Sequence, residues 1–292
     1  MHNKFYIVDV FAEKKYSGNQ LAVIRNGGDL SSEEMQKIAF EFNFPETTFI
    51  LSDDINNNGF DVRIFTPKEE IPFAGHPTLG TAYIIQNEIL SNPNDKVTLN
   101  LKVGQIEVTI DKNLEIFQMQ QNQPSFGQLF EADIICEVLS ITKQELDTKF
   151  PIEGVSTGLP CIIVPLKNLL ALKKIKINRK KYFDLVGNIS AKLILAFCSE
   201  TYSDDLDLSV RVFVDYYGIP EDPATGSGNG CLAGYIVKHR YFDKTQIKIQ
   251  TGQGYEISRH SKIYLKAAEN DNGIDVFVGG KVIKIAEGSL II

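Results

Sequence analysis

Two related stretches of the chain decide its fold. Residues 63–85 read RIFTPKEEIPFAGHPTLGTAYII, and residues 211–237 read RVFVDYYGIPEDPATGSGNGCLAGYIV. At an offset of 148 (211 minus 63) they share Arg, Phe, Ile and Pro within ten positions, and after four inserted residues Tyr83-Ile84 falls on Tyr235-Ile236. Each stretch is typical of a strand, a Pro-containing turn, a Gly-rich corner and a helix. Because the offset is close to half of the 292 residues, we interpret the pattern as the duplication of a domain.

A weaker sequence similarity that supports the duplication lies upstream of each stretch. Ser17-Gly18 stands before the apolar run 21–24, and Thr157-Gly158 stands before the apolar run 161–164. Between the halves lies the polar segment 118–124, which ends in Pro124 and is typical of a linker. The sequence therefore predicts two domains with a boundary near residue 120.

The remaining pattern mixes strands with few helices. Residues 5–10, 60–65, 97–101 and 106–110 alternate in polarity or are rich in β-branched residues, and Gly104 makes the last two a hairpin. We expect an antiparallel or mixed sheet.

One amphipathic helix is signalled after residue 30, where Ser31 and Glu34 make a capping box. The apolar residues that follow on one helical face are Met35, Ile38, Ala39 and Phe42. We expect this helix to cover the outside of a sheet.

Two further helices, at about 76–90 and 227–239, have no polar face. Their middles read LGTAYII and GCLAGYIV, which are apolar or small on every side. A helix that is apolar all round is buried all round, and its small residues let strands approach closely. The sequence therefore predicts an α+β fold of two similar units, each with a sheet wrapped around a central helix.

The composition restricts the classes of partner. The chain is 43% apolar and carries 30 basic against 37 acidic residues, which gives a net charge of −7 and a pI of about 5.3. This balance argues against nucleic acid or an anionic membrane as partner. The first fifteen residues, MHNKFYIVDVFAEKK, carry charges where a signal peptide would be apolar, so we expect a cytoplasmic protein.

The cysteines and histidines offer little to a metal. The four cysteines are widely spaced without a C-x-x-C pair, and the four histidines make no H-x-H or H-E-x-x-H pair. We expect no disulfide and no metal.

The starts of the two buried helices can bind an anion. Gly75-His76 begins the first helix, and Gly226-Ser227-Gly228 begins the second. The first N–H groups of a helix lack internal partners and carry partial positive charge, so they can hold a carboxylate even in an acidic protein. We expect Pro77 at the first helical position and Ser227 as a cap. If the halves are related by a pseudo-two-fold axis, both starts face one cleft.

A nucleotide-binding oxidoreductase is a competing functional hypothesis. Gly228-x-Gly230-x-x-Ala233 fits a dinucleotide fingerprint. However, a long loop with two prolines separates these glycines from the preceding strand, which ends near Tyr217, and no acidic residue closes the following strand at 246–250. A G-x-S-x-G hydrolase motif and a phosphate-binding P-loop are both absent from the sequence.

Glu46 is the candidate acid/base. It lies in the segment FPETTFI, between apolar residues, where burial would raise the pKa of its carboxyl group toward the range in which a general base works. Taken singly, Glu46, His76, Asp222 and Ser227 each also fit an ordinary structural role.

Several segments together resemble the PhzF-type phenazine-biosynthesis isomerase family, which shares its fold with diaminopimelate epimerase. They span nearly the whole chain, and the most specific are His76-Pro77-Thr78 and Asp222-Pro223-Ala224-Thr225-Gly226-Ser227. The other segments are Val8 to Phe11 with Ser17 to Asn19, Glu46 to Phe49, Phe73 to Gly80, and Gly279-Gly280 with Glu287-Gly288.

The resemblance implies a fold and a chemistry. It implies two pseudo-symmetric domains with a β-barrel-like sheet around each helix, here residues 1–118 with a returning strand 279–292, and residues 119–278, with the active site in the cleft between them. The implied activity is the cofactor-free isomerisation of trans-2,3-dihydro-3-hydroxyanthranilate, in a homodimer. The implied roles are Glu46 as acid/base, with His76, Asp222 and Ser227 assisting protonation and orientation and Asn19 touching substrate. From the helix starts we expect Gly75, Gly226 and Gly228 to bind substrate as well.

Three functions remain open at this level: a single-base isomerase, a racemase or epimerase of amino or hydroxy acids, and a non-catalytic binder of small carboxylates. The epimerases that share this fold resemble enzymes with two bases, one cysteine at the start of each central helix. The corresponding positions here carry Gly75-His76 and Ser227-Gly228, so neither cysteine is present. The sequence shows no counterpart of Glu46 in the second half. We therefore favour the isomerase, acting on a small cyclic or unsaturated carboxylate.

Overall fold

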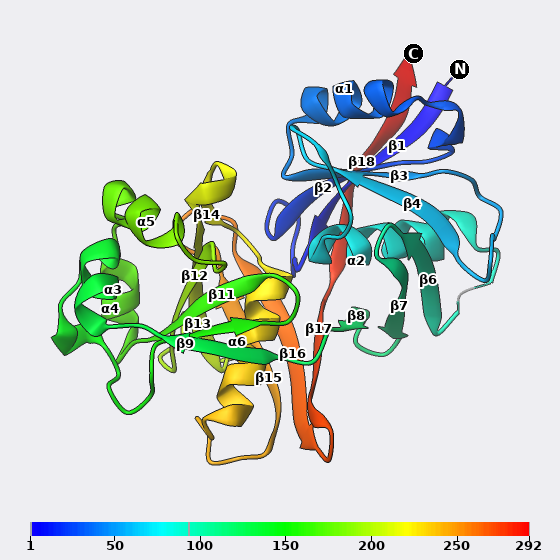
Figure 1. Cartoon of the computed structure of the whole chain (residues 1–292). Helices are drawn as coiled ribbons and strands as arrows, with labels where there is room; N and C mark the ends of the chain where they lie inside the picture. Colours follow the sequence, from blue (N-terminus) through cyan, green and yellow to red (C-terminus); the bar gives the residue numbers. More distant parts are fainter. Residues whose placement is uncertain (1, 93, 292) are drawn as a thin grey trace. The chain divides into compact units, whose positions relative to one another are not determined.

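The computed structural model describes residues 2–92 and 94–291. The chain divides into two compact units (Figure 1). The first unit comprises residues 1–119 and 279–292, and the second comprises residues 120–278.

The first unit consists of a mixed sheet with one helix inside it and one outside. Its strands are β1 (His2–Val10), β2 (Asn19–Ile24), β3 (Glu46–Ile50), β4 (Phe60–Phe65), β5 (Glu70–Ile71), β6 (Lys96–Leu101), β7 (Gly104–Asp111), β8 (Ile116–Gln120) and β18 (Val282–Ile291). Its helices are α1 (Ser32–Phe42) and α2 (Gly75–Ile84), and α2 continues as a π-helical turn at Ile85–Ile89. The last strand, β18, pairs antiparallel with β1.

The second unit repeats this plan with extra helices. Its strands are β9 (Ser125–Leu129), β10 (Glu153–Ser156), β11 (Pro160–Pro165), β12 (Leu193–Cys198), β13 (Leu208–Val214), β14 (Ile219–Asp222), β15 (Gln246–Gln253), β16 (Ser261–Asn270) and β17 (Gly273–Gly280). Its helices are α3 (Ala132–Leu139), α4 (Leu169–Lys174), α5 (Arg179–Val186) and α6 (Gly226–Lys238).

The strand pairing confirms the duplication. In the first unit β1–β2 is antiparallel, β2–β3 parallel, β3–β4 and β4–β5 antiparallel, β4–β6 parallel and β6–β7 antiparallel. The series β10–β11, β11–β12, β12–β13, β13–β14, β13–β15 and β15–β16 has the same directions in the same order. The predicted α+β fold with mixed, mostly antiparallel sheets is therefore correct.

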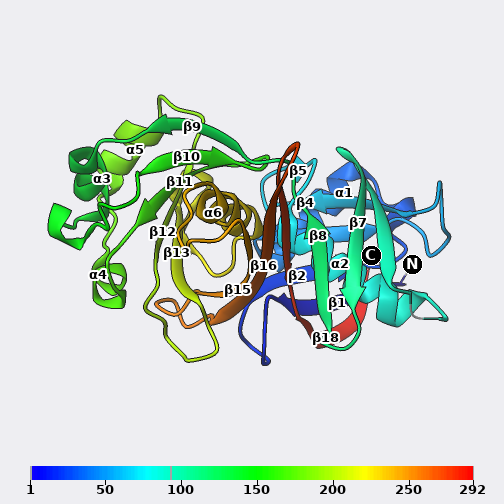
Figure 2. The ribbon, with the colours of Figure 1, turned by 90° about the horizontal axis from the view of Figure 1, so that it is seen from below.

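The central helices are buried as their sequences predicted. In the first unit α2 contacts β1, β2, β3, β6, β7 and β18, and in the second unit α6 contacts β10, β11, β12, β15 and β16. Figure 2 shows α6 end-on inside its ring of strands. The contact is so close that a Cβ atom on Gly80 of α2 would lie 2.6 Å from Leu21 Cδ2, and one on Gly234 of α6 would lie 2.8 Å from Pro124 Cβ. The small residues of these helices are therefore required by the approach of the surrounding chain.

Helix α1 has the predicted capping box and packs on the outside of the first sheet (Figure 1). The Ser31 hydroxyl accepts from the Glu34 N–H group, and the Glu34 carboxylate accepts from the Ser31 N–H group. Met35 and Ala39 are buried against Ile24 and Phe49, with Ile38 and Phe42 at the margin of the cluster. The predicted apolar face is confirmed.

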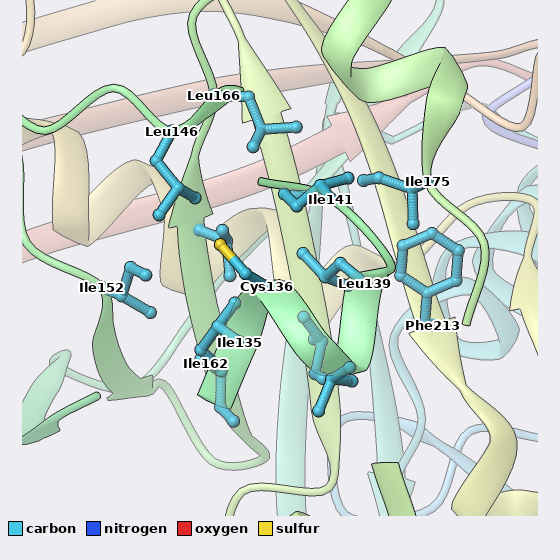
Figure 3. Packing of buried hydrophobic residues seen from close by; sticks show 14 of the residues in the cluster. Ile135, Cys136, Leu139, Ile141, Leu146, Ile152, Ile162, Leu166, Ile175 and Phe213 are labelled. Atoms are coloured by element: carbon cyan, nitrogen blue, oxygen red, sulfur yellow. The ribbon is translucent and has the colours of Figure 1, made fainter. Parts of the chain in front are cut away.

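The outer layer of the second unit was not anticipated by the sequence pattern. Helices α3, α4 and α5 build a second apolar cluster on the far side of β11, β12 and β13 from α6 (Figure 2). Figure 3 shows Ile135 and Leu139 of α3 in this cluster together with Ile162 of β11 and Phe213 of β13. These helices are short, six to eight residues, so their periodicity is weak.

Two local predictions are wrong. The segment 118–124 is not a free linker, because its first residues extend β8 to Gln120 and the Gln121 N–H group donates to the Val276 carbonyl oxygen. The loop before the second corner is interrupted by β14, which folds back on β13. Within the described residues, no helix is long and apolar enough to cross a membrane.

Equivalent strands of the two units carry the same bidentate ion pair. Arg63 on β4 binds the Glu70 carboxylate through Nε and Nη2 at 2.8 and 2.7 Å, and Arg211 on β13 binds the Glu221 carboxylate in the same way at 2.9 and 2.7 Å. The pairs differ in burial, because the Arg63 side chain is 24% exposed and the Arg211 side chain 8%. Arg211 Nη1 also donates to the carbonyl oxygens of Leu172 and Ile175, which ties the end of α4 to the sheet.

We predict that Arg211→Met lowers the free energy of unfolding by about 3–5 kcal/mol, because it leaves a buried carboxylate and two buried carbonyl oxygens without their donor. The matched variant Arg63→Met should lose only about 1 kcal/mol, since Glu70 is partly exposed and keeps its ion pair with Lys102 at 2.7 Å. Urea unfolding of both variants measures this difference. Equal losses would show that burial does not distinguish the two pairs.

Candidate active site

The candidate site of the first unit begins in the turn between β1 and β2. Gly18 has φ +69°, and a Cβ atom there would lie 2.3 Å from the Val10 carbonyl oxygen, so only glycine fits the turn. The turn delivers Asn19 to the first position of β2, where its side chain is buried. The next residue, Gln20, presents its carbonyl oxygen to the start of α2.

Glu46 is brought to the same place by the strand order. It is the first residue of β3, and the parallel pairing of β2 with β3 sets it opposite Leu21. Its side chain is 17% exposed, and its Oε2 atom lies 3.2 Å from His76 Nε2. The apolar flanks of Glu46 therefore predicted its partial burial correctly.

The His76 ring is held between two acceptors. Its Nε2 atom lies 3.3 Å from the Gln20 carbonyl oxygen in addition to its contact with Glu46. A carbonyl oxygen only accepts, so Nε2 carries the proton and Nδ1 carries the lone pair. Burial lowers the pKa of His76 to about 3, with the hydrogen bond to Gln20 acting in the opposite direction. The ring is therefore neutral at neutral pH, and its Nε2–H group donates to the Gln20 carbonyl oxygen while lying beside Glu46 Oε2.

A buried hydroxyl pair joins the two elements that carry these side chains. Thr48 Oγ1 of β3 lies 2.7 Å from Thr81 Oγ1 of α2, and both residues are fully buried. Thr48 is two residues beyond Glu46, and Thr81 is five residues beyond His76. This hydrogen bond fixes the start of β3 against the helix and so limits the movement of Glu46 relative to His76.

The two helix starts lack a side-chain cap, and their first residues differ from the prediction. Helix α2 begins at Gly75 with Ala74 as N-cap, so Pro77 is its third residue and not its first. Helix α6 begins at Gly226 with Thr225 as N-cap, so Ser227 lies within the first turn and is not the cap. Neither N-cap residue makes a side-chain capping hydrogen bond. The absence of a cap agrees with helix starts whose N–H groups are available to a ligand.

Asp222 of the second unit belongs to a buried polar cluster. Its Oδ2 atom accepts a hydrogen bond from the Thr225 hydroxyl, and its carbonyl oxygen accepts from Gln253 Nε2 at 2.8 Å. Asn229 and Thr251 complete the cluster. Gly226 and Gly228 are buried in the first turn of α6, whereas Ser227 is half-buried. Thus Asn19, Glu46, Gly75 and His76 gather in one unit, and Asp222, Gly226, Ser227 and Gly228 in the other.

Sequence reasoning missed four polar residues of these two groups. Gln20 acts through its carbonyl oxygen, which leaves no trace in the sequence. Thr225 stood inside the Asp-Pro-Ala-Thr-Gly-Ser segment, and Asn229 is a polar residue in a helix without a polar face, so both were detectable. Gln253, at the end of β15, carries no sequence signal.

The pseudo-symmetric counterpart of Glu46 is apolar. Cys161 follows Thr157-Gly158 at the same distance as Leu21 follows Ser17-Gly18, so the two residues are equivalent. Leu21 pairs with Glu46, and Cys161 pairs with Leu193. Leu193 is the first residue of β12, as Glu46 is of β3, and it is buried. The second unit therefore has no carboxyl group at the position that Glu46 occupies in the first.

The cysteines are all buried and unpaired with one another. Burial raises the pKa of Cys231 to about 11 and that of Cys198 to about 12, and it raises the pKa values of Cys136 and Cys161 as well. Cys231 lies beyond the first turn of α6 and contacts Thr157 and the Leu159 carbonyl oxygen. These thiols are protonated at neutral pH and are poor proton acceptors.

The fold contradicts the hypothesis that Gly228 and Gly230 belong to a dinucleotide-binding motif. Gly228 and Gly230 lie inside α6 rather than in the turn before it, and a Cβ atom on Gly230 would meet Gln121 and Thr157. The preceding strand, β14, is antiparallel to β13, whereas the fingerprint requires a parallel β-α-β unit. Among residues 2–92 and 94–291, His, Cys, Asp and Glu side chains form no group of three that could hold a metal ion.

Comparison with known proteins agrees with the geometry of both units. Residues 8–288 match the PhzC-PhzF family, described as phenazine biosynthesis-like protein. The chain belongs to this family. It is 31% identical over 295 residues to a trans-2,3-dihydro-3-hydroxyanthranilate isomerase of Pseudomonas aeruginosa, and the alignment covers 99% of each chain. This PhzF-family chain is therefore an enzyme of the isomerase class.

Solved structures confirm the predicted fold of this PhzF-family enzyme. A PhzF-family phenazine biosynthesis protein of Bacillus anthracis matches with a TM-score of 0.91 at 26% identity, over 100% of both chains. A hydroxyproline epimerase of Agrobacterium vitis matches with a TM-score of 0.60 over 99% of this chain and 92% of that chain. At 9% identity the second likeness shows a shared fold alone.

We predict that His76 stays neutral, with the proton on Nε2, from pH 8 to pH 5. Spectra of the ¹⁵N-histidine-labelled enzyme should show one protonated and one bare ring nitrogen throughout this range, and His76→Gln removes these signals and so assigns them. In the urea-unfolded chain the same ring should titrate near 6.5. Because the unfolded ring binds a proton below that pH and the folded ring does not until about 3, this residue's contribution to stability is complete above about 6.5 and is lost as the pH falls toward 3. A doubly protonated ring at pH 6 would contradict the assignment.

Proposed function

We propose that this enzyme moves a proton between two carbons of a small cyclic or unsaturated carboxylate, with Glu46 as its single acid/base and without a cofactor. The observation that supports this most directly is the contact of Glu46 Oε2 with His76 Nε2 at 3.2 Å. Trans-2,3-dihydro-3-hydroxyanthranilate, the substrate named for the relative in Pseudomonas aeruginosa, is the first compound to test.

In the proposed reaction the Glu46 carboxylate takes a proton from one substrate carbon. The electron pair of the broken C–H bond enters the adjacent unsaturated system, and the resulting carboxylic acid returns the proton to a different carbon. The composition of the substrate is unchanged, and Glu46 ends as a carboxylate. Its partial burial favours this role, because a carboxylate with little water around it is a stronger base.

The neutral His76 ring has a definite part in this scheme. It lies 3.2 Å from Glu46 Oε2 without adding a positive charge, and it limits the orientations open to the carboxyl group. A charged imidazolium would make Glu46 a weaker base. Burial of His76 keeps the ring uncharged and therefore favours proton abstraction by Glu46.

The substrate carboxylate is proposed to bind at helix starts, through the backbone N–H groups of Gly75, His76, Gly226 and Ser227. Asn19 and Gly228 are proposed as further substrate contacts, and Asp222 and Ser227 as groups that assist reprotonation. Preorganised donors of this kind can stabilise negative charge as it develops in the transition state. The expected homodimer stays a prediction, which light scattering of the purified enzyme measures.

A two-base epimerase is disfavoured by two observations. Leu193 stands where a second carboxyl base would be expected by pseudo-symmetry, and the Cys231 thiol at the second helix has a pKa of about 11. A lone base suits a proton shift along one face of a substrate better than inversion at one carbon. Among the residues that the structure describes, no contact favours the non-catalytic binder over an enzyme.

We predict that Glu46→Gln abolishes exchange of substrate hydrogen with deuterated water, with a loss of at least about 100-fold, because the amide cannot accept the proton. Binding of the substrate, measured by calorimetry, should change little, since the amide keeps the shape of the side chain. The control is Glu41→Gln, which alters an exposed carboxyl group on α1 and should leave the rate unchanged. Exchange at the wild-type rate in Glu46→Gln would remove Glu46 from the mechanism.

A further inference from the structure

Every hydrogen-bonding position of the Gln253 side-chain amide is occupied by another group of the protein. Gln253 lies at the end of β15 and has no exposed surface. Its Nε2 atom donates to the Asp222 carbonyl oxygen at 2.8 Å and to Thr225 Oγ1 at 3.0 Å, and its Oε1 atom accepts from the Thr225 N–H group at 3.2 Å and from Asn229 Nδ2 at 2.9 Å. Two donors and two acceptor sites are the full capacity of a primary amide.

The orientation of this amide follows from the backbone groups beside it. The Thr225 N–H group can only donate, so the Gln253 atom that faces it must be the oxygen. The Asp222 carbonyl oxygen can only accept, so the atom that faces it must be the nitrogen. Both contacts give the same assignment, and a flipped amide would place like groups against each other at both positions.

The direction of the Thr225 hydroxyl is then determined as well. Because Gln253 Nε2 can only donate, Thr225 Oγ1 accepts from it and has its own hydrogen left for another partner. The Asp222 carboxyl oxygen Oδ2 is that partner. The hydroxyl therefore points its hydrogen at Asp222, and turning that hydrogen toward Gln253 would break the bond from Gln253.

We propose that Gln253 is a positioning residue whose amide locks the Thr225 hydroxyl as a permanent donor to Asp222 Oδ2. Gln253 acts through Thr225. The consequence for catalysis rests on the proposed function, in which the Asp222 carboxyl group assists reprotonation. With a fixed donor on Oδ2, Asp222 keeps one orientation, and its charged form is favoured over its protonated form.

The backbone near Asp222 has a separate support, which distinguishes the role of Gln253 from simple packing. Ser261 Oγ donates to the Pro223 carbonyl oxygen at 2.7 Å, and a Cβ atom on Gly254, at φ +77°, would lie 2.7 Å from the same oxygen. The charged neighbours Arg211, Glu221 and Glu256 form ion pairs among themselves. Gln253 therefore reaches the Asp222 carboxyl group through the Thr225 hydroxyl, and it holds the Asp222 backbone directly through the carbonyl oxygen.

The direct test is the titration of the Asp222 side chain, followed by the ¹³C signal of its carboxyl carbon and assigned with Asp222→Asn. Thr225→Val removes the donor while keeping the shape of the side chain, and Gln253→Met removes the amide at similar length. Both variants should raise the pKa of Asp222, because the charged form loses a hydrogen bond. The acid dissociation constant of Asp222 should therefore fall about tenfold. Thr225→Ser keeps the hydroxyl and should titrate like the wild type.

The matched control is Thr251→Val. This variant removes an equally buried hydrogen bond of the same cluster, from Thr251 Oγ1 to Asn229 Oδ1 at 2.7 Å, but touches neither Asp222 nor Thr225. It should destabilise the protein and leave the titration of Asp222 unchanged. In the double variant Thr225→Val with Gln253→Met, the dissociation constant should change no further than in Thr225→Val alone. Unchanged titration in Thr225→Val, or an equal change in Thr251→Val, would overturn the proposal.

Activity separates this proposal from the proposed function. With trans-2,3-dihydro-3-hydroxyanthranilate as the probe, Gln253→Met and Thr225→Val should lower kcat for deuterium exchange about tenfold with little change in KM. If the titration changes as expected but Asp222→Asn exchanges at the wild-type rate, the catalytic role of Asp222 fails and the positioning by Gln253 stands. If Asp222→Asn is inactive but Gln253→Met titrates like the wild type, the positioning fails and the proposed function stands.

Discussion

Each unit is organised by a helix that has no face suited to water. Burying α2 or α6 on every side requires strands around the helix, and the glycines at 80 and 234 let the surrounding chain approach it closely. The ends of such a helix are the only places where polar groups can gather without being enclosed by the apolar packing. The start of α2 accordingly lies beside the first residues of β2 and β3, and Glu46, Gln20 and His76 come together there.

The two units use the same architecture for different chemistry. In the first, the Glu46 carboxylate, the neutral His76 imidazole and the Gln20 carbonyl oxygen form a small group in which the Glu46 side chain stays partly exposed while its Oε2 atom is buried. In the second, the equivalent strand begins with Leu193, and the polar groups instead form a closed network around Asp222. Duplication supplied two similar helix starts, and only one of them carries a Glu–His pair. This asymmetry is the observation on which the proposed single-base mechanism rests.

The fold was largely predictable because its main signals are repeated or periodic. The 148-residue offset, the capping box at Ser31 and the two helices without a polar face each correspond to an observed element. The layer formed by α3, α4 and α5 was not predictable, because helices of six to eight residues are too short to show a period. The exact helix starts also differed, since Pro77 and Ser227 satisfy the preferences for several positions of a first turn.

The candidate site was predictable only in part. Glu46 stood out by its apolar flanks, and the partner ring of His76 was suggested by the family resemblance. The contacts that orient these groups come from residues remote in sequence or from backbone atoms, as with Gln253 and the Gln20 carbonyl oxygen. No single-sequence pattern reports a side-chain amide that meets a corner 28 residues away.

The central claim, that one carboxyl group both removes and returns the proton, is tested most directly by following the label itself. Substrate that carries deuterium at the reacting carbon is converted in ordinary water, and the product is analysed at the earliest turnover. A lone carboxyl base predicts that a measurable fraction of the product retains deuterium at a new carbon. Complete loss of deuterium to water, together with inversion at the original carbon, would contradict the account and indicate two bases.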